Sequence, residues 1–278
     1  HKEYRRQRQM CIRDRRKHFP LKNKGLAWGS RPRLAVRAVD GVSFDIFKGE
    51  TLGVVGESGC GKSTTARLLM QLTAQDQGEL VFDGQAVDSR QLPLREFRRQ
   101  TQMVFQDSYS SLNPRMTIED SIAFGPTVHG LPQRQAIVRA HDLLARVGLE
   151  PARFAGRYPH ELSGGQRQRV NIARALALEP RLVILDEAVS ALDKSVEAQV
   201  LNLLMDLKRD LGLTYVFISH DLNVVRFMSD RVLVMYLGQV VEVGPAEAVF
   251  ERPAHPYTQA LLRSCLLYTS PSPRDQRG

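Results

Sequence analysis

Residues 56–63 read Gly-Glu-Ser-Gly-Cys-Gly-Lys-Ser, between an apolar run at 51–55 and a helix-compatible run at 64–72. A strand, a glycine-rich turn and a helix in this order are the sequence context of a phosphate-binding loop. The glycines let successive backbone N–H groups turn inward around phosphate oxygens, and the helix aims its N-terminal dipole at the same point. Lys62 can then reach the terminal phosphates, and Ser63 can coordinate Mg²⁺. The alternative is a glycine-rich turn that fits the pattern by accident. The predicted nucleotide-binding residues are Gly56, Glu57, Ser58, Gly59, Cys60, Gly61, Lys62, Ser63 and Thr64.

Length and composition restrict the class of protein. The chain has 278 residues, of which 42% are hydrophobic, enough for one large domain or for a domain with a subdomain. No apolar run approaches the ~20 residues that cross a bilayer, and no signal peptide is recognisable, so we expect a cytosolic protein. Three cysteines at these spacings exclude a disulfide framework and a cysteine metal cluster.

The formal net charge of +9 is concentrated at the two ends of the chain. Residues 1–16 contribute +5 and residues 265–278 contribute +1, which leaves +3 for the body. That value is ordinary and does not indicate nucleic-acid binding. Residues 7–15 and 265–275 resemble translated sequencing-adapter read-through, so we expect both ends to lie outside the fold. The alternative is a basic disordered arm and a Ser/Pro-rich tail.

Strand and helix patterns alternate along most of the chain. We expect two strands in 34–47 with a turn at Asp40-Gly41, a hairpin at 80–87 and a strand at 103–105. Further strands are predicted at 182–185 and 215–218, and a hairpin at 232–243 turns at Gly238. Helices are predicted at 93–99, 166–178 and 195–211, and residues 107–162 form a mostly helical insertion with an amphipathic helix at 133–147. The pattern predicts an α/β fold with a mainly parallel sheet and helices on both faces.

A carboxylate pair follows one of these strands. The apolar residues 182–185 lead directly into Asp186 and Glu187. This places both carboxylates at the C-terminal edge of the sheet, where ligands of open α/β sheets bind. Because side chains alternate along a strand, the two point in different directions and suit two tasks. Asp186 can hold Mg²⁺, directly or through water, and Glu187 can be the general base that activates a water. Alone, the pattern also fits a solvated acidic turn.

Residues 162–166 read Leu-Ser-Gly-Gly-Gln, directly before a predicted helix. In isolation this is a serine N-cap followed by a flexible turn. Together with the phosphate loop and the carboxylate pair, it resembles the signature motif of the nucleotide-binding subunits of ATP-binding cassette (ABC) transporters. In that family the signature helix binds the γ-phosphate of ATP held by the opposite subunit, by the physics of helix N-termini. The resemblance assigns the signature to Leu162, Ser163, Gly164, Gly165 and Gln166.

The same resemblance implies roles for four further residues. Gln106 corresponds to the glutamine that senses Mg²⁺ and the attacking water, and His220 to the histidine that contacts the γ-phosphate. Asp193 corresponds to the aspartate that communicates across the dimer, and Phe19 is the aromatic expected to stack on adenine, with a buried core aromatic as its alternative. The implied catalytic residues are Glu187, His220 and Gln106, and the implied metal-binding residues are Ser63, Gln106 and Asp186.

Two stretches are similar to the oligopeptide and dipeptide importer branch of the family. They are Phe-Gln-Asp at 105–107 followed by Ser-Leu-Asn-Pro-Arg at 111–115, and His-Pro-Tyr-Thr-Gln-Ala-Leu-Leu at 255–262. Their simpler interpretations are a turn with Asn-Pro punctuation and an ordinary amphipathic helix. Similarity spans roughly residues 17–264, and the family's first strand is expected to be absent from this chain.

The resemblance implies a nucleotide-binding core with a mainly parallel sheet of the RecA-like type, an antiparallel β subdomain and a helical subdomain. We assign the flank to 1–16, the core to 17–106 and 166–250, the helical subdomain to 107–165, the start of a C-terminal extension to 251–264 and a tail to 265–278.

The implied activity is hydrolysis of ATP with Mg²⁺ at the cytoplasmic face of the cell membrane, to drive import of oligopeptides, dipeptides or a related solute. The implied partners are two membrane permeases, a second ATP-binding subunit, identical or related, and indirectly an extracytoplasmic solute-binding protein, but no nucleic acid. The alternatives are an importer ATPase for another solute, such as nickel or glutathione, an ABC-type ATPase that acts on nucleic acid, and a nucleotide-dependent module without turnover. The sequence does not name the solute.

Overall fold

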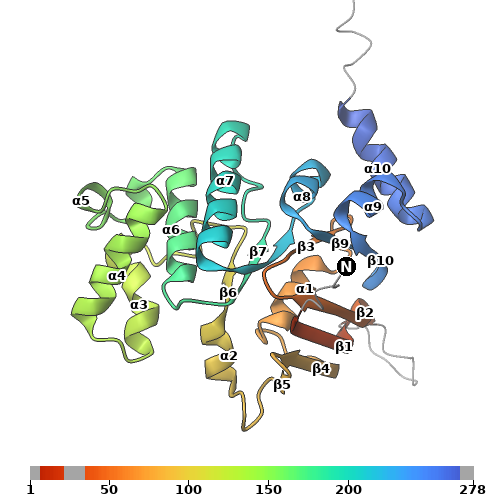
Figure 1. Ribbon diagram of the computed structural model, residues 1–278, viewed down its shortest axis with the longest axis horizontal. Helices are drawn as coiled ribbons and strands as arrows, with labels where there is room; N and C mark the ends of the chain where they lie inside the picture. Colours follow the sequence, from red (N-terminus) through yellow and green to blue (C-terminus); the bar gives the residue numbers. More distant parts are fainter. Residues whose placement is uncertain (1–6, 22–34, 270–278) are drawn as a thin grey trace, which may run out of the picture.

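The computed structural model describes residues 7–21 and 35–269, with side chains up to residue 264. A six-stranded sheet, in the order β10-β9-β3-β8-β7-β6, crosses the centre of the molecule (Figure 1). All neighbours in it are parallel except β9 and β10, which form an antiparallel hairpin. The α/β prediction with a mainly parallel sheet is therefore confirmed. The strands are β3 (Thr51–Val55), β6 (Thr101–Val104), β7 (Leu182–Asp186), β8 (Thr214–Ile218), β9 (Arg231–Tyr236) and β10 (Gln239–Pro245).

The central strands are short apolar runs because both of their faces are covered. Every residue of β3, β7 and β8 is buried. In β7, Val183 and Leu185 belong to a core shared with the helices α6 (Gly164–Leu176) and α7 (Lys194–Leu211). The intervening residues Leu182 and Ile184 belong to a second core, shared with the antiparallel sheet and α1 (Lys62–Leu69). Burial on both faces replaces the alternation expected of a half-exposed strand.

A second, four-stranded sheet packs beside α1 in the order β2-β1-β4-β5. Its described pairings are all antiparallel, and it forms a separate layer below the central sheet in Figure 1. The expected antiparallel β subdomain is thus present. Its strands are β1 (Arg8–Pro20), β2 (Ala35–Phe47), β4 (Gln77–Phe82) and β5 (Gln85–Ala86).

The expectation that the first strand is absent and that residues 1–16 are a flank outside the fold is wrong for residues 8–16. They form the first part of β1, between β2 and β4. Met10 and Ile12 are each only 1% exposed and belong to the second core. The high charge was misleading because a strand with one buried face tolerates charged residues at alternate positions. Residues 1–6 lie outside the described residues.

The predicted turn at Asp40-Gly41 is also wrong, because residues 35–47 form one strand. Arg15 pairs with Val42 and Arg16 pairs with Asp40, so Gly41 has no partner residue in the register. Gly41 has a φ of 71°, which is the conformation of a glycine in a β-bulge. A glycine after an aspartate therefore marks a bulge here rather than a reversal of the chain.

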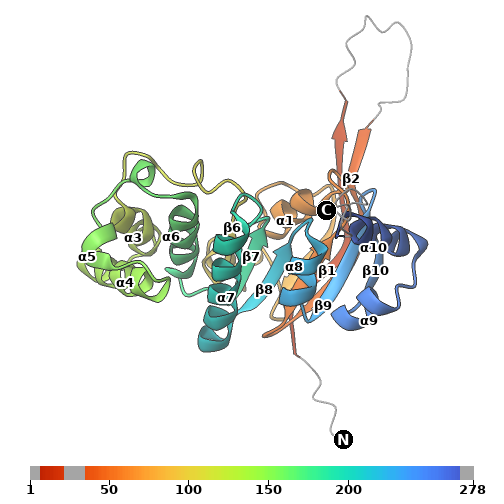
Figure 2. The same ribbon diagram turned by 90° about the horizontal axis from the view of Figure 1, so that it is seen from above.

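Helices gather at one end of the central sheet, beyond β6 (Figures 1 and 2). Pro126 lies inside α3, and Gly148, with a φ of 75°, follows α4, so the punctuation seen in the sequence shapes these elements. The helices of this region are α3 (Ile118–Val128), α4 (Gln133–Arg146), α5 (Pro151–Phe154), the 3₁₀ helix η1 (Pro159–Glu161) and α6. Helix α2 (Leu94–Gln100) lies between β5 and β6 in the chain.

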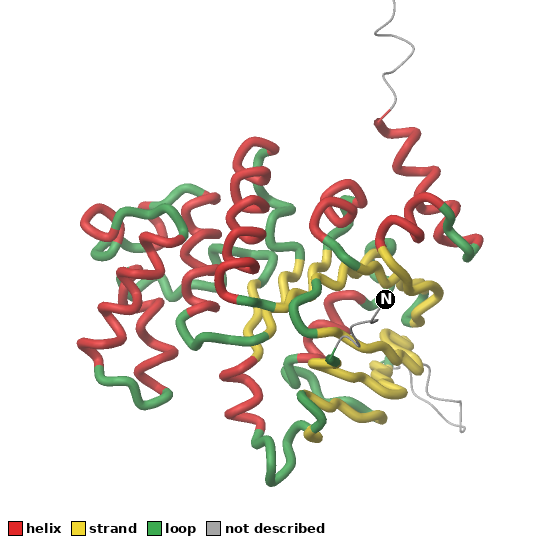
Figure 3. The backbone as a smooth tube through the Cα atoms, in the orientation of Figure 1, coloured by secondary structure: helices red, strands yellow, loops and turns green. Residues whose placement is uncertain are grey.

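The C-terminal part of the chain contains two helices that the sequence did not predict, α8 (Leu222–Met228) and α9 (Ala246–Glu251). Both are too short to show a clear helical period. Helix α10 (Pro256–Thr269) continues past residue 264, so residues 265–269 are not the unstructured tail that was expected. It lies beside β10, at the opposite end of the molecule from α3 and α4 (Figure 3). Within 7–21 and 35–269, no helix has the length and hydropathy of a membrane span.

Candidate functional site

The glycines of residues 56–63 adopt backbone conformations that a side chain disfavours. Gly56, Gly59 and Gly61 have φ values of 148°, 80° and 109°. A Cβ on Gly56 would overlap the carbonyl oxygen of Met235, and one on Gly61 would overlap the carbonyl oxygen of Ala38. The backbone of this loop is therefore packed against β9 and β2. Glycine is required at these two positions by this packing as well as by the close approach of a ligand.

A turn at the tip of the β9–β10 hairpin holds this loop from the side. The N–H of Gly238 donates to the carbonyl oxygen of Cys60 at 2.9 Å. Sequence reasoning placed Gly238 only as a turn residue, since nothing in its neighbours indicates a contact 178 positions away in the chain. Cys60 itself is buried, and burial raises the pKa of its thiol.

Lys62 lies inside the loop and is only 5% exposed. Its Nζ donates to the carbonyl oxygens of Gly56 at 2.7 Å and Glu57 at 2.9 Å. The described hydrogen bonds of this buried ammonium group to oxygen go to neutral carbonyls, an arrangement that suits a site which receives an anionic ligand. The conformation of the loop and the charge of Lys62 both fit a phosphate chain.

Ser63 and Asp186 meet at the edge of this loop. The Ser63 hydroxyl donates to Oδ1 of Asp186 at 3.1 Å, which joins the start of α1 to the end of β7. Asp186 is 6% exposed, and burial raises the pKa of its carboxyl, against the effect of the Ser63 hydrogen bond. A hydroxyl and a carboxylate are hard oxygen ligands of the kind that Mg²⁺ binds beside nucleotide phosphates. Both residues could therefore hold Mg²⁺.

Glu187, Gln106 and His220 converge although they lie far apart in the sequence. Nε2 of Gln106 donates to Oε2 of Glu187 at 2.9 Å, and Nδ1 of His220 lies 3.5 Å from the same oxygen. They follow the carboxyl ends of β6, β7 and β8, which are adjacent in the sheet, and this adjacency brings them together. The arrangement presents one carboxylate oxygen between an amide and an imidazole.

Glu187 has a left-handed backbone with a φ of 49°, which is uncommon for a residue with a side chain. Its N–H donates to the carbonyl oxygen of Ile218, and its own carbonyl accepts from the hydroxyl of Ser190 at 3.0 Å. The conformation costs roughly 1–2 kcal/mol and is held by these bonds. Strain of this kind is typical of functional residues, whose side chains must point in one direction.

The signature residues occupy the N-terminus of α6. Ser163 is its N-cap, accepting from the N–H of Gln166 at 3.3 Å, while Oε1 of Gln166 accepts from the N–H of Ser163 at 3.0 Å. A Cβ on Gly165 would overlap Val196 of α7. Ser163 is exposed and Leu162 is buried. The serine N-cap considered from the sequence is thus present, and the first turn of α6 is available at the surface.

Other predicted residues are placed as follows. Asp193 is exposed and is the N-cap of α7, because its Oδ1 accepts from the N–H of Val196 at 2.9 Å. Phe19 is 41% exposed near the end of β1, with the ammonium of Lys17 5.6 Å from its ring centre, and so it is not the buried core aromatic of the alternative. Thr64, next to Ser63, is half-buried in the first turn of α1.

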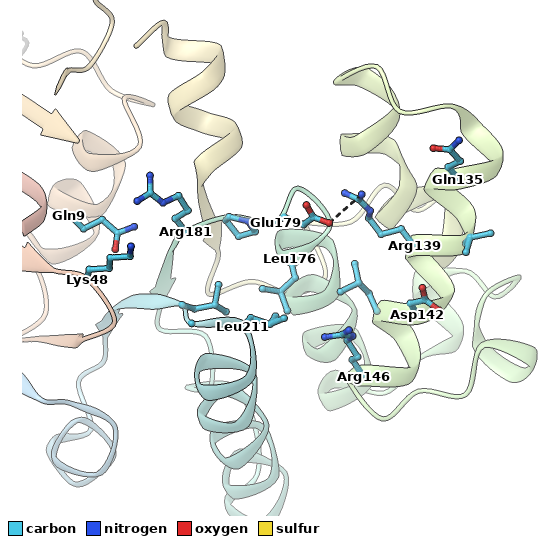
Figure 4. Close-up of a pocket in the computed structure, with 15 residues that line it drawn as sticks. Gln9, Lys48, Gln135, Arg139, Asp142, Arg146, Leu176, Glu179, Arg181 and Leu211 are labelled. Carbon is cyan, nitrogen blue, oxygen red and sulfur yellow. Dashed lines mark ion pairs between the residues drawn. The ribbon is translucent and has the colours of Figure 1, made fainter. Parts of the chain in front are cut away.

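A pocket with a volume of about 600 Å³ lies away from the phosphate loop. It lies between α4 and the segments that precede β3, β7 and β8, where Lys48, Arg181 and Leu213 are found (Figure 4). In it, Arg139 forms an ion pair with Glu179 at 3.2 Å. Since the loop follows the carboxyl end of β3, this pocket is at the other edge of the sheet.

These features define a phosphate-loop ATPase: a glycine loop after a parallel strand, a buried lysine, and a carboxylate pair at the end of the strand β7. The family assignment follows from comparison with known proteins. Residues 39–190 match the family described as ABC transporter, and residues 241–277 match the family described as oligopeptide/dipeptide transporter, C-terminal region. The chain belongs to the ABC transporter family, and it is an ATPase of that family.

Two curated relatives illustrate the similarity. The oligopeptide transport ATP-binding protein OppF of Bacillus subtilis is 53% identical over 251 residues, which cover 89% of this chain and 81% of OppF. The glutathione import ATP-binding protein GsiA of Escherichia coli K12 is 54% identical over 261 residues, which cover 93% of this chain. The chain spans only 41% of GsiA.

Solved structures support the fold. The structure of CbiO1 from Clostridium perfringens, part of an ABC transporter complex, has a TM-score of 0.74 and 26% identity and covers 95% of this chain and 96% of that chain. The ATP-binding cassette MJ0796 in a post-hydrolysis state with ADP and phosphate has a TM-score of 0.71 and 28% identity, covering 85% and 98% of the two chains.

Proposed function

We propose that this chain binds Mg²⁺–ATP in the loop at 56–63 and hydrolyses it between two subunits that close head to tail. The observation that carries the proposal is the convergence of Gln106 and His220 on the carboxylate of Glu187, beside a loop that holds a buried lysine. In the proposed closed state, the N-terminus of α6 from the facing subunit completes the site with the exposed Ser163 and the half-buried Gly165.

The residues divide the chemistry among them. Lys62 turns from the loop carbonyls to the terminal phosphates, while Ser63, Asp186 and Gln106 would hold Mg²⁺, which would neutralise charge on the phosphates. Glu187 accepts a proton from the attacking water, and Gln106 and His220 fix the direction of its carboxylate. Because contacts to the γ-phosphate favour the closed pair, hydrolysis weakens closure. Asp193, at the start of α7, communicates across the pair, and Phe19 stacks on adenine.

The solute we propose is an oligopeptide or dipeptide, with glutathione as the related alternative. This follows from the similarity to OppF and GsiA and from the match of residues 241–277. Two membrane permeases, a second ATP-binding subunit and indirectly a solute-binding protein would be the partners, at the cytoplasmic face of the membrane. Replacing OppF in Bacillus subtilis with this chain should restore uptake of a labelled tetrapeptide, whereas a Lys62→Ala chain should not. Restored glutathione uptake without peptide uptake would contradict the peptide assignment.

The shared site is tested by mixing two inactive variants. Lys62→Ala damages the phosphate loop, and Ser163→Arg damages the signature. If each site combines one subunit's loop with the other's signature, a mixed pair contains one intact site. An equimolar mixture then recovers about a quarter of wild-type phosphate release, because half of the pairs are mixed and each has one active site. If the loop and the signature act within one chain, the mixture stays as inactive as its components.

The role of Glu187 is tested separately from the pairing. Glu187→Gln keeps the shape of the side chain and removes the base, so ATP binding should be retained while turnover falls by ~10²–10⁴. Glu197→Gln is a matched control, since Glu197 lies on α7 and pairs with Lys194 at 3.0 Å, away from the loop. Near-normal phosphate release by Glu187→Gln would remove Glu187 from the proposed role.

A further inference from the structure

Helix α10 brings one side chain to the phosphate loop. The N–H of Glu57 donates to the hydroxyl of Tyr257, the second residue of this helix, at 3.0 Å. The peptide unit that carries this N–H also carries the carbonyl of Gly56, which accepts from Nζ of Lys62 at 2.7 Å. A single peptide unit is therefore bonded on one side to the C-terminal segment and on the other to the lysine that the site depends on.

The hydroxyl of Tyr257 is itself held in place. Its ring packs against the ring of Tyr236, at the end of β9, with the ring centres 4.2 Å apart. The N–H of Tyr257 donates to Nδ1 of His255 at 3.1 Å. Burial raises the pKa of the Tyr257 phenol, so the group stays neutral.

The start of α10 is anchored to the core by one carboxylate. Glu242 of β10 accepts from the N–H groups of Ala254 at 2.9 Å and His255 at 3.0 Å. These bonds compensate for burial and lower the pKa of the Glu242 carboxyl, so it remains ionised. Two backbone bonds to a charged acceptor fix the segment at 254–257 more firmly than neutral bonds would. Figure 2 shows α10 alongside β10, away from the helices beyond β6.

We propose that Tyr257 is a positioning residue for ATP binding: it fixes the peptide unit between Gly56 and Glu57 and so sets the place of Lys62 in the phosphate loop. The segment at 254–257 then controls nucleotide affinity from outside the loop. Without this bond the peptide unit keeps only the hydrogen bond from Lys62 to the Gly56 carbonyl, and Gly56, with a φ of 148° and no side chain, restrains its rotation little. The inference rests on the proposed binding of ATP at this loop.

The test compares two variants of the full chain. Tyr257→Phe keeps the ring contact and removes the acceptor, whereas Tyr236→Phe removes a hydroxyl for which the described residues provide no hydrogen-bond partner. Loss of one neutral hydrogen bond corresponds to about a three- to tenfold weaker affinity. We expect Kd for ATP, from titration calorimetry, and KM to rise by that factor in Tyr257→Phe alone, with kcat unchanged. Hydrogen exchange at the Glu57 amide should accelerate in the same variant.

Three outcomes are distinguishable. If the Lys62→Ala variant binds ATP as tightly as the wild-type chain, the proposed site of ATP binding is wrong. If wild-type binding depends on Lys62 but Tyr257→Phe binds ATP as tightly as Tyr236→Phe, with equal exchange at Glu57, the positioning role is overturned. A fall in thermal stability of Tyr257→Phe with unchanged Kd would likewise assign Tyr257 to structure alone.

Discussion

The signature glycine Gly165 packs against Val196 of α7, and we have also proposed that it contacts ATP across the pair. An alanine there would gain about 0.5–1 kcal/mol of helix propensity. Its Cβ would overlap Cγ1 of Val196, however, and overpacking costs about 1–3 kcal/mol. We therefore expect Gly165→Ala to lower the free energy of unfolding by about 1–2 kcal/mol.

Shortening the opposing side chain should reverse this loss. Val196 is half-buried, so Val196→Ala alone should cost about 1 kcal/mol. In the double variant the overlap is gone and the helix propensity is retained, so its stability should lie within about 0.5 kcal/mol of wild type. The coupling free energy between the two positions is then about 2 kcal/mol, measurable from urea unfolding of the nucleotide-free chain at unchanged m-value.

Phosphate release by the double variant distinguishes the two roles. If Gly165 also contacts ATP across the pair, activity stays low although stability is restored. Recovery of full activity would mean that Gly165 serves packing alone, and its predicted ATP contact would be wrong. Single-variant effects that add to within about 0.5 kcal/mol would refute the steric argument itself.

Three further changes test other parts of the structure. Because burial raises the pKa of Asp186, its ionisation opposes folding: its contribution is favourable below the unfolded pKa and is lost as pH rises through the folded pKa. Asp186→Asn should therefore raise the thermal unfolding midpoint of the nucleotide-free chain at pH 7, and this gain should shrink toward pH 4. The same variant should lose ATP hydrolysis. An equal gain in the unfolding midpoint at both pH values would contradict this reasoning. Ile12→Ala should lower the free energy of unfolding, measured with urea, by about 2–5 kcal/mol, whereas Arg13→Ala should lower it by less than about 0.5 kcal/mol. Equal effects of the two substitutions would place this strand outside the core. In Gly61→Ala the new Cβ meets a carbonyl oxygen, so the free energy of unfolding should fall by more than about 2 kcal/mol and ATP binding should be abolished. In Gly59→Ala the new Cβ faces open space, so only backbone strain of about 1–2 kcal/mol should be lost from the stability. Similar losses for the two variants in thermal unfolding would argue against the overlap at Gly61.

The local parts of the fold were predictable because their signals lie within a few residues. The run at 182–185 is apolar throughout, and its structure is a strand with both faces buried. The first strand was missed because its four arginines outweighed Met10 and Ile12, which are the two residues that enter the core. Helix α8 was missed because its start depends on one N-cap, Asp221, which accepts from the N–H groups of Asn223 and Val224.

The candidate site likewise contains parts that the sequence predicts and parts that depend on contacts between distant residues. The phosphate loop and the carboxylate pair are local patterns, and their sequence context indicated them directly. The meeting of Gln106, Glu187 and His220 depends on strand order, which the sequence restricted only to a parallel sheet; their proximity was expected from the family resemblance. The contacts of Gly238 and Tyr257 with the loop join residues far apart in the chain. The residues next to them in the sequence do not predict either contact.

The loop at 56–63 is supported by three distant segments: the carbonyl of Ala38, the hairpin tip at Gly238 and the phenol of Tyr257. A fragment cut to residues 39–190 would lose all three and leave the Glu57 N–H and the Cys60 carbonyl to water. Because such a fragment also lacks β8 and β9, the two strands that flank β3, nucleotide affinities measured on it would not describe the loop of the intact chain. Boundary choice is therefore an experimental variable in its own right, and comparisons between cassettes are meaningful only when the hairpin and the start of α10 are retained.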